Sequence, residues 1–364
     1  MKISEIISAL EMLAPPALQE DYDNAGLLTG EPEQECTGVL CTLDATEEVI
    51  REAAAGKLNL VVAHHPINFR GLKRINGRNY VERAVIAAIR SDVAIYAIHT
   101  NLDNVIDGVS GRMAQLLGLE SCEVLVPRPQ QLRKLFTFVP GEHAEAVRAA
   151  LFAAGAGFIG NYSECSFNAE GYGTFRAGAG TDPFVGEPGK QHREQETRIE
   201  LIFPAHAEKA VVAALRAAHP YEEPAFDIVR LENSYGRTGS GVIGELPEAV
   251  DPLQMLQRLK QIFRVPLIRH TRLPDRKLKR IAVCGGAGSF LISKALAAGA
   301  DLYVTADIKY HEFFDGESKM LIADIGHYES EQFTMDLLRE VLEQKFPNFA
   351  VLKTETNTNP VLYF

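Results

Sequence analysis

The chain has 364 residues and is 46% hydrophobic, so it is long enough to bury the cores of two or three domains. Lysine and arginine number 37 against 48 aspartates and glutamates, and the net charge of −11 argues against general binding to nucleic acid or to an anionic membrane. Five scattered cysteines without a Cys-x-x-Cys pair indicate neither a zinc ribbon nor a disulfide framework.

The N-terminal segment 3–13 predicts an amphipathic helix. Its isoleucines and leucines recur at helical spacing, and the pattern stops before Pro15 and Pro16. The segment does not have the pattern of a signal peptide. No apolar run approaches the ~20 residues that span a bilayer. We therefore expect a soluble, cytoplasmic protein that does not contact membranes.

Two outer segments, 1–127 and 236–364, alternate predicted strands with predicted helices. Such alternation is typical of mainly parallel sheets covered on both faces, which is the α/β class. In the first segment we predict strands at 38–43, 58–63 and 93–98 and helices at 45–55 and 81–90. In the second we predict strands at 280–284, 301–305 and 320–325 and helices at 253–263, 291–298 and 332–345.

The two outer segments also resemble each other. Residues 59–65 align with 301–307, and in both cases a helix ending in alanine and glycine (Gly56 and Gly299) leads into the strand. We infer a duplicated α/β unit with a functional site between its two copies.

The middle segment, 128–235, repeats a strand followed by an alanine-rich helix. Two strand candidates lie between the repeats, and a closing strand completes a β-α-β…β-α-β order, which is typical of the ferredoxin-like plan. We therefore expect core lobes at 1–127 and 236–364, interrupted by an α+β insert at 128–235. Within the insert we predict strands at 136–140, 159–169, 173–178, 200–204 and 226–231 and helices at 143–151 and 206–215.

Imidazole and carboxylate side chains gather at the ends of three predicted strands. Two of these ends carry a histidine four residues before a carboxylate, and the third carries two adjacent histidines before Pro66. Adjacent histidines on a regular strand point to opposite faces, so at a strand end they can diverge onto two ions. Divalent transition metals favour this set of ligands, and a carboxylate can bridge two ions. The candidate ligands are His64, His65, His99, Asp103, His327 and Glu331.

Three nearby features leave alternatives open. Asp307 and His311 follow the strand that mirrors His64 and His65, and each could be a ligand, a partner that orients a ligand, or an acid–base group. The run 284–289 (CGGAGS) has the glycines of a phosphate-binding turn but lacks the lysine of a P-loop. Close packing between helix and sheet explains those glycines equally well.

Short motifs recur along both outer segments: 21–30 (DYDNAGLLTG), 64–66 (HHP), 99–103 (HTNLD), 305–311 (TADIKYH), 327–331 (HYESE) and 358–360 (TNP). Together they resemble the Nif-three-like family, whose members are often labelled GTP cyclohydrolase 1 type 2 homolog. The middle segment, with 219–224 (HPYEEP), is similar to the insert of the long bacterial members, which resembles the trimer-forming PII and CutA fold. Tyr22 departs from the tryptophan that is usual in the family.

The resemblance implies a centre of two divalent metal ions in each subunit. It implies that His65 and Asp103 bind one ion, that His64 and His327 bind the other, and that Glu331 bridges both. Ligands without cysteine suit zinc, iron or manganese.

The resemblance also implies a toroidal homohexamer that encloses a cavity. We expect a metal-dependent hydrolase, similar to GTP cyclohydrolase, that acts on a nucleotide or another small molecule. His99 and His311 are the candidate catalytic residues, for proton transfer or for support of the ligands. The alternative is a non-enzymatic protein that delivers metal or regulates through a small effector. A nucleic-acid partner has the least support, because the charge is negative and no recognition motif is present.

Overall fold

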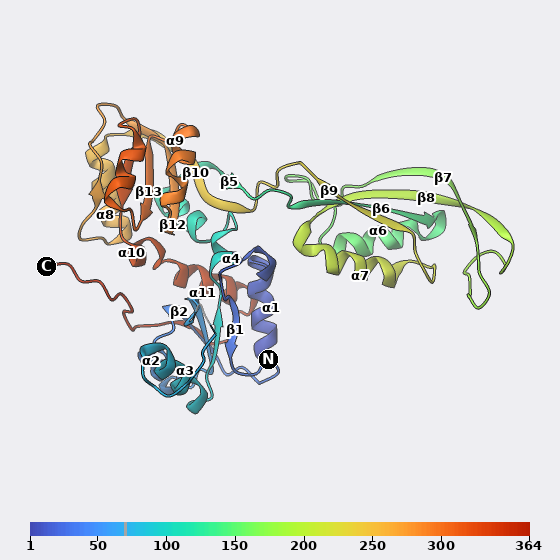
Figure 1. Cartoon of the computed structure of the whole chain (residues 1–364), viewed down its shortest axis with the longest axis horizontal. Coiled ribbons are helices and arrows are strands. Elements are labelled where there is room, and N and C mark those ends of the chain that lie inside the picture. Colours follow the sequence, from blue (N-terminus) through green and yellow to red (C-terminus); the bar gives the residue numbers. More distant parts are fainter. Residues whose placement is uncertain (69–70) are drawn as a thin grey trace. The chain divides into compact units, whose positions relative to one another are not determined.

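The computed structural model describes residues 1–68 and 71–364. The chain forms two compact units, which we call the core unit (Met1–Pro127 with Gly236–Phe364) and the insert (Arg128–Tyr235). Helices and strands interleave in both (Figure 1), which confirms the predicted α/β class.

The first sheet of the core unit has the strand order β1-β4-β3-β2-β15. All neighbours in it are parallel except the edge strand β1, which runs antiparallel to β4. Alternate residues of its central strands are buried on opposite faces: Val39 packs beneath α1 and α11, whereas Leu40 packs beneath α2 and α3. The strands are β1 (Gly26–Thr29), β2 (Val39–Asp44), β3 (Leu60–His65), β4 (Ala94–Ala97) and β15 (Val351–Lys353).

The second sheet of the core unit has the order β11-β14-β13-β12-β10-β5. Its centre, β12 to β14, is parallel, and antiparallel strands flank it on both sides. The parallel triplets β2-β3-β4 and β12-β13-β14 therefore correspond, as expected for a duplicated unit. The strands are β5 (Glu120–Pro127), β10 (Gly239–Val250), β11 (Arg269–His270), β12 (Leu278–Ala287), β13 (Leu302–Ala306) and β14 (Leu321–Asp324).

Helices cover both faces of both sheets, and the chain crosses between the sheets. The C-terminal helix α11 packs on the first sheet, while α5 from the N-terminal segment packs on the second. Local signals set the helix ends: Asp251 caps α8 ahead of Pro252, and α5 stops at the left-handed Gly118. The helices are α1 (Ile3–Leu13), α2 (Glu47–Ala55), α3 (Tyr80–Arg90), α4 (Thr100–Asp103), α5 (Val109–Leu117), α8 (Pro252–Phe263), α9 (Ile292–Ala297), α10 (His327–Glu331) and α11 (Thr334–Lys345).

The insert is a four-stranded antiparallel sheet of order β7-β8-β6-β9. Helices α6 and α7 cover one face of this sheet (Figure 1), and the chain order is β-α-β-β-α-β, which has one strand fewer than the sequence predicted between the two strand-helix repeats. Its elements are β6 (Leu132–Pro140), α6 (Ala144–Ala153), β7 (Phe167–Arg176), β8 (Gln191–Pro204), α7 (Glu208–Ala218) and β9 (Phe226–Leu231).

One predicted strand of the insert is wrong over most of its length. Residues 159–169 and 173–178 were expected to form two strands, but the structure has one, β7, which begins at Phe167. Three glycines with positive φ, Gly155, Gly157 and Gly160, turn the chain before it. Apolar residues in this stretch resemble a strand in sequence, but the backbone between them is a turn.

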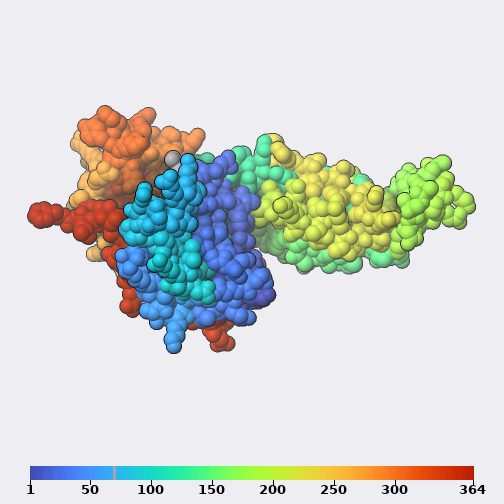
Figure 2. All heavy atoms as spheres, turned by 60° about the horizontal axis from the view of Figure 1, so that its bottom comes forward, coloured from blue at the N-terminus to red at the C-terminus, as the bar shows by residue number. Residues whose placement is uncertain are grey.

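The C-terminal residues, red in Figure 2, extend from the surface of the core unit, where Leu362 and Phe364 are exposed. Across residues 1–68 and 71–364, no helix combines the length and the apolar character that crossing a bilayer requires.

Removal of the insert should leave a folded core. Pro127 and Gly239 are paired residues of the adjacent strands β5 and β10, so a linker of about four residues can close them as a hairpin. We expect a chain without residues 128–235 to be soluble, to unfold cooperatively and to bind divalent metal, as measured by circular dichroism and metal analysis. The control is the full chain with the same linker placed after Pro127. An insoluble or metal-free core would contradict an autonomous insert.

Candidate metal centre

Strand ends of both sheets bring the predicted ligands together. His64 and His65 end β3, Asp103 ends the short helix α4 after β4, and α10 after β14 runs from His327 to Glu331. Three groups of potential metal-binding side chains each have their ligand atoms within 4.8 Å of one another. These groups are His64 with His65 and His99, His64 with Asp103 and Glu331, and His65 with His327 and Glu331.

Glu331 is the carboxylate that two of these groups share. Its Oε2 lies 3.0 Å from His65 Nε2 and 3.2 Å from His327 Nε2. Its Oε1 lies 3.9 Å from His64 Nε2, which in turn lies 3.6 Å from Asp103 Oδ1. The two oxygens of one carboxylate therefore face two different sets of ligand atoms.

Each imidazole of the cluster has an oxygen acceptor at its Nδ1. Such a partner favours the tautomer in which Nδ1 carries the proton, and this leaves Nε2 available as a ligand. Three of the acceptors are carboxylates, which also make the imidazoles more basic. The pairs are His64 with the carbonyl of Ile98 at 2.9 Å, His65 with Asp44 at 2.8 Å, His99 with Asp23 at 2.8 Å and His327 with Asp307 at 2.7 Å.

Two atoms in the centre of the cluster are buried without a hydrogen-bond partner among the described residues. They are His64 Nε2 and Asp103 Oδ1, which face each other. A buried polar atom without a partner costs about 1–3 kcal/mol. A cation between the imidazole and the carboxylate would satisfy both atoms, so the residues present fit a divalent ion.

The electrostatics of the cluster concentrate negative charge on Glu331. Burial opposes its ionisation, but the neighbouring imidazoles, His327 foremost, hold its pKa well below the ordinary value. Burial opposes protonation of His65, yet hydrogen bonds to Asp44 and Glu331 raise its pKa to about 10. For His327, hydrogen bonds to Glu331 and Asp307 likewise outweigh burial and raise the pKa to about 9. A cation therefore competes with protons for these nitrogens.

The glycine-rich run 284–289 serves close packing at the site. Gly286 lies in β12 with φ +61°, and a Cβ added there would overlap Glu331 Oε1. Its N–H also lies 3.0 Å from the hydroxyl oxygen of Ser330 in α10. Of the two explanations left open by the sequence, close packing accounts for this glycine.

Sequence reasoning missed the supporting residues Asp23 and Asp44. Both follow signals that were present, because Asp23 lies in the motif 21–30 and Asp44 ends a buried strand as His65 does. The C-terminal motif also reaches the site: Thr358 donates to Asp44 at 2.7 Å, and the side-chain amide of Asn359 donates to Glu329 at 3.1 Å.

The cluster opens into a cavity of about 820 Å³, which is bounded by core-unit residues only. His65, His99, Asp103, His327 and Glu331 line it, and so do the exposed aromatic residues Tyr22, Tyr80 and Phe290. His311 is not one of the described lining residues. It is exposed in the 3₁₀ helix Tyr310–Gly316, where its ring contacts Tyr310 and Phe314.

Fold and cluster together define an α/β protein whose core unit has two sheets and a candidate metal centre at its strand ends. The model of the family Duf34/NIF3 (NGG1p interacting factor 3) matches residues 1–360. The chain therefore belongs to the Duf34/NIF3 family.

Relatives of similar length support this assignment. The chain is 39% identical to a GTP cyclohydrolase 1 type 2 homolog of Halalkalibacterium halodurans, with 100% of both chains covered. It is 38% identical to the Bacillus subtilis protein of the same name, with 99% of this chain and 98% of that protein covered. A crystal structure of a Bacillus cereus protein related to NIF3 superposes with a TM-score of 0.87 at 38% identity and covers 100% of this chain and 99% of its own.

Replacement of Gly286 by alanine should weaken metal binding. The new methyl group would displace the Glu331 carboxylate that two ligand groups share. Gly299→Ala is the matched control, because Gly299 also has positive φ (+76°), but among the described residues no atom beyond its chain neighbours lies within 4 Å of an added Cβ. The strained φ should cost each variant about 1 kcal/mol of stability, and the overlap with Glu331 adds to this cost in Gly286→Ala. Only Gly286→Ala should also lower metal affinity in a calorimetric titration. Equal affinities in the two variants would contradict this account.

Proposed function

We propose that this protein binds two divalent metal ions per chain and uses them to hydrolyse a nucleotide or another small molecule. The observation that carries the proposal is the position of Glu331, whose two oxygens face two separate sets of ligand atoms. The orphaned pair His64 Nε2 and Asp103 Oδ1 supports a cation at one of these positions.

His64, His65, Asp103, His327 and Glu331 are the proposed ligands. When bound, two such ions activate water and stabilise negative charge that develops on an attacked centre. The ligand atoms group His64 with Asp103 and His65 with His327, each with Glu331. The resemblance predicted the other division, His65 with Asp103 and His64 with His327, and that division stays a prediction. Nitrogen and oxygen ligands favour zinc, iron or manganese.

The surrounding residues suit a nucleotide-sized substrate. The cavity of about 820 Å³ falls within the range of ~300–1,000 Å³ that is typical of small-molecule sites. Tyr22, Tyr80 and Phe290 present exposed rings that can stack on a base. The relatives are named GTP cyclohydrolase 1 type 2 homolog, so GTP is the first nucleotide to test.

Proton transfer is the role we propose for His99. Its Nδ1 is held by Asp23, and its ring lies 5.4 Å from that of His65 in the cavity wall. His311 was proposed for the same role from sequence, and its exposed position requires that it act on a substrate that extends beyond the described cavity.

Glu331→Gln should reduce binding at both metal positions, because a neutral amide bridges two cations poorly. His64→Ala should chiefly reduce binding at one position. Glu329→Gln is a matched control, since Glu329 is also a buried carboxylate of α10 but belongs to no ligand group among the described residues. Metal content after saturation and desalting measures the effect. Equal small losses in Glu331→Gln and His64→Ala would contradict the shared carboxylate.

Hydrolysis can be measured with metal-loaded protein and a panel of nucleotides that begins with GTP. We expect turnover in the wild type, a loss of at least about tenfold in His99→Gln with metal content retained, and complete loss in His64→Ala. Metal transfer to apo-proteins without any turnover would contradict the hydrolase and favour the metal-delivery alternative.

We further propose that six chains form a closed ring. The insert is predicted to resemble the trimer-forming PII and CutA fold, and closed symmetry is the usual end state of self-complementary surfaces. Light scattering in physiological salt should give a mass near six times that of the 40.0 kDa chain. A stable mass of one or two chains would refute the ring.

A further inference from the structure

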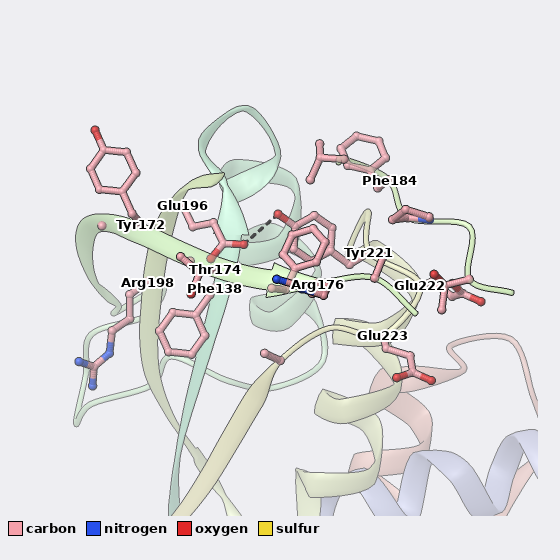
Figure 3. Close-up of a pocket in the computed structure, with 18 of the residues that line it drawn as sticks. Phe138, Tyr172, Thr174, Arg176, Phe184, Glu196, Arg198, Tyr221, Glu222 and Glu223 are labelled. Atoms are coloured by element: carbon pink, nitrogen blue, oxygen red, sulfur yellow. Dashed lines mark hydrogen bonds between the residues drawn. The ribbon is translucent and has the colours of Figure 1, made fainter. Parts of the chain in front are cut away.

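A second cavity, of about 770 Å³, lies in the insert and is lined by insert residues only (Figure 3). It opens on the sheet face opposite to α6 and α7, because Glu196 and Arg198 of β8 line it while the alternate residues Ile199 and Leu201 pack beneath the helices. This cavity shares no lining residue with the cavity of the candidate metal centre.

Glu196 is a buried carboxylate in the wall of this cavity. Only 8% of the residue is exposed, and its Oε1 accepts a hydrogen bond of 2.8 Å from the hydroxyl of Tyr221 (Figure 3). Its Oε2 packs against the backbone of β7, where a Cβ on Gly173 would overlap it. Within residues 1–68 and 71–364, no lysine, arginine or histidine lies close enough to form an ion pair with it.

A buried carboxylate without a cationic partner is costly, and neutral hydrogen bonds offset only part of that cost. The arginines that line the cavity do not supply the missing charge. Arg198 lies 3.0 Å from Glu200 and stacks over Phe136, and Arg176 is exposed. Four glutamates against two arginines line the cavity, so its field favours a cation and disfavours an anion: Glu170, Glu196, Glu222 and Glu223 against Arg176 and Arg198.

Aromatic rings form the rest of the cavity wall. The rings of Phe175 and Phe184 each lie 6.2 Å from that of Tyr221, and Phe138 adds a further face. Phe184 belongs to the loop 177–190, which folds back onto the insert through the contact of Phe184 with His143 at 5.3 Å and a hydrogen bond from the Asp182 N–H to Glu222. Aromatic faces beside a carboxylate are the usual way in which proteins bind organic ammonium or guanidinium groups.

We propose that this cavity binds a small organic cation, with its amine or guanidinium group on Glu196 and its apolar body between the aromatic rings. A bare metal ion suits the cavity poorly, because Glu196 is its one buried carboxylate among the described lining residues and no histidine or cysteine lines it. The insert is thus a binding module for an amine or guanidine, distinct from the metal centre of the core unit.

Isothermal titration of the full chain tests this assignment with two cations, tyramine and agmatine. Tyrosol, in which a hydroxyl replaces the amine of tyramine, is the neutral probe. We expect at least one cation to bind with a Kd below about 1 mM and tyrosol to bind at least about tenfold more weakly.

Two variants locate the binding. Glu196→Gln keeps an acceptor for Tyr221 and should weaken the cation at least about tenfold. Glu145→Gln removes the same charge from an exposed residue of α6, on the other face of the sheet, and should change the Kd less than about threefold. Gly173→Ala should also weaken binding, because it displaces the carboxylate without changing the charge. Circular dichroism verifies that each variant is folded. No binding of either cation at millimolar concentration, equal binding of tyrosol, or unchanged binding in folded Glu196→Gln would overturn the proposal.

Discussion

The structure of the core unit depends on one interaction, the approach of three imidazoles to the buried carboxylate of Glu331. Only 3% of Glu331 is exposed, and such a charge is tolerated because His65, His327 and His64 surround it. His64 and His65 end a strand of the first sheet, whereas His327 and Glu331 follow a strand of the second sheet. The cluster can therefore form only when the ends of these strands lie close together. The candidate site around this carboxylate therefore requires that both sheets of the core unit are folded.

The path of the chain links the two sheets to each other. Helix α11 and strand β15, from the end of the sequence, join the first sheet, while α5 and β5, from before the insert, join the second. Each half of the chain therefore contributes to both sheets, and neither can separate without loss of buried apolar contacts. The insert leaves and re-enters through the paired strands β5 and β10 of the second sheet. The start of β10 lies beside the candidate site, because the Gly239 N–H donates to the carbonyl of Asn104 and Ser240 lines the cavity.

Much of this arrangement could be predicted from the sequence, because buried parallel strands have an unmistakable apolar pattern. The candidate ligands were predicted from polar residues at the ends of such strands, and the structure brings His64, His65, Asp103, His327 and Glu331 together. Residues that act through a neighbour were harder to find: Asp44 supports His65 only because β2 lies beside β3. The edge strand β5 and its neighbour β10 escaped prediction because their burial alternates irregularly, and the turn that contains Gly160 was mistaken for part of a strand.

Anomalous X-ray scattering from crystals saturated with zinc or manganese tests the central claim most directly. Two peaks per chain are predicted, about 3.5–4 Å apart, one on each side of the Glu331 carboxylate. The division of the remaining ligands between the two peaks also decides whether His64 shares its ion with Asp103 or with His327. A single peak at saturating metal, or peaks that do not contact Glu331, would contradict the account.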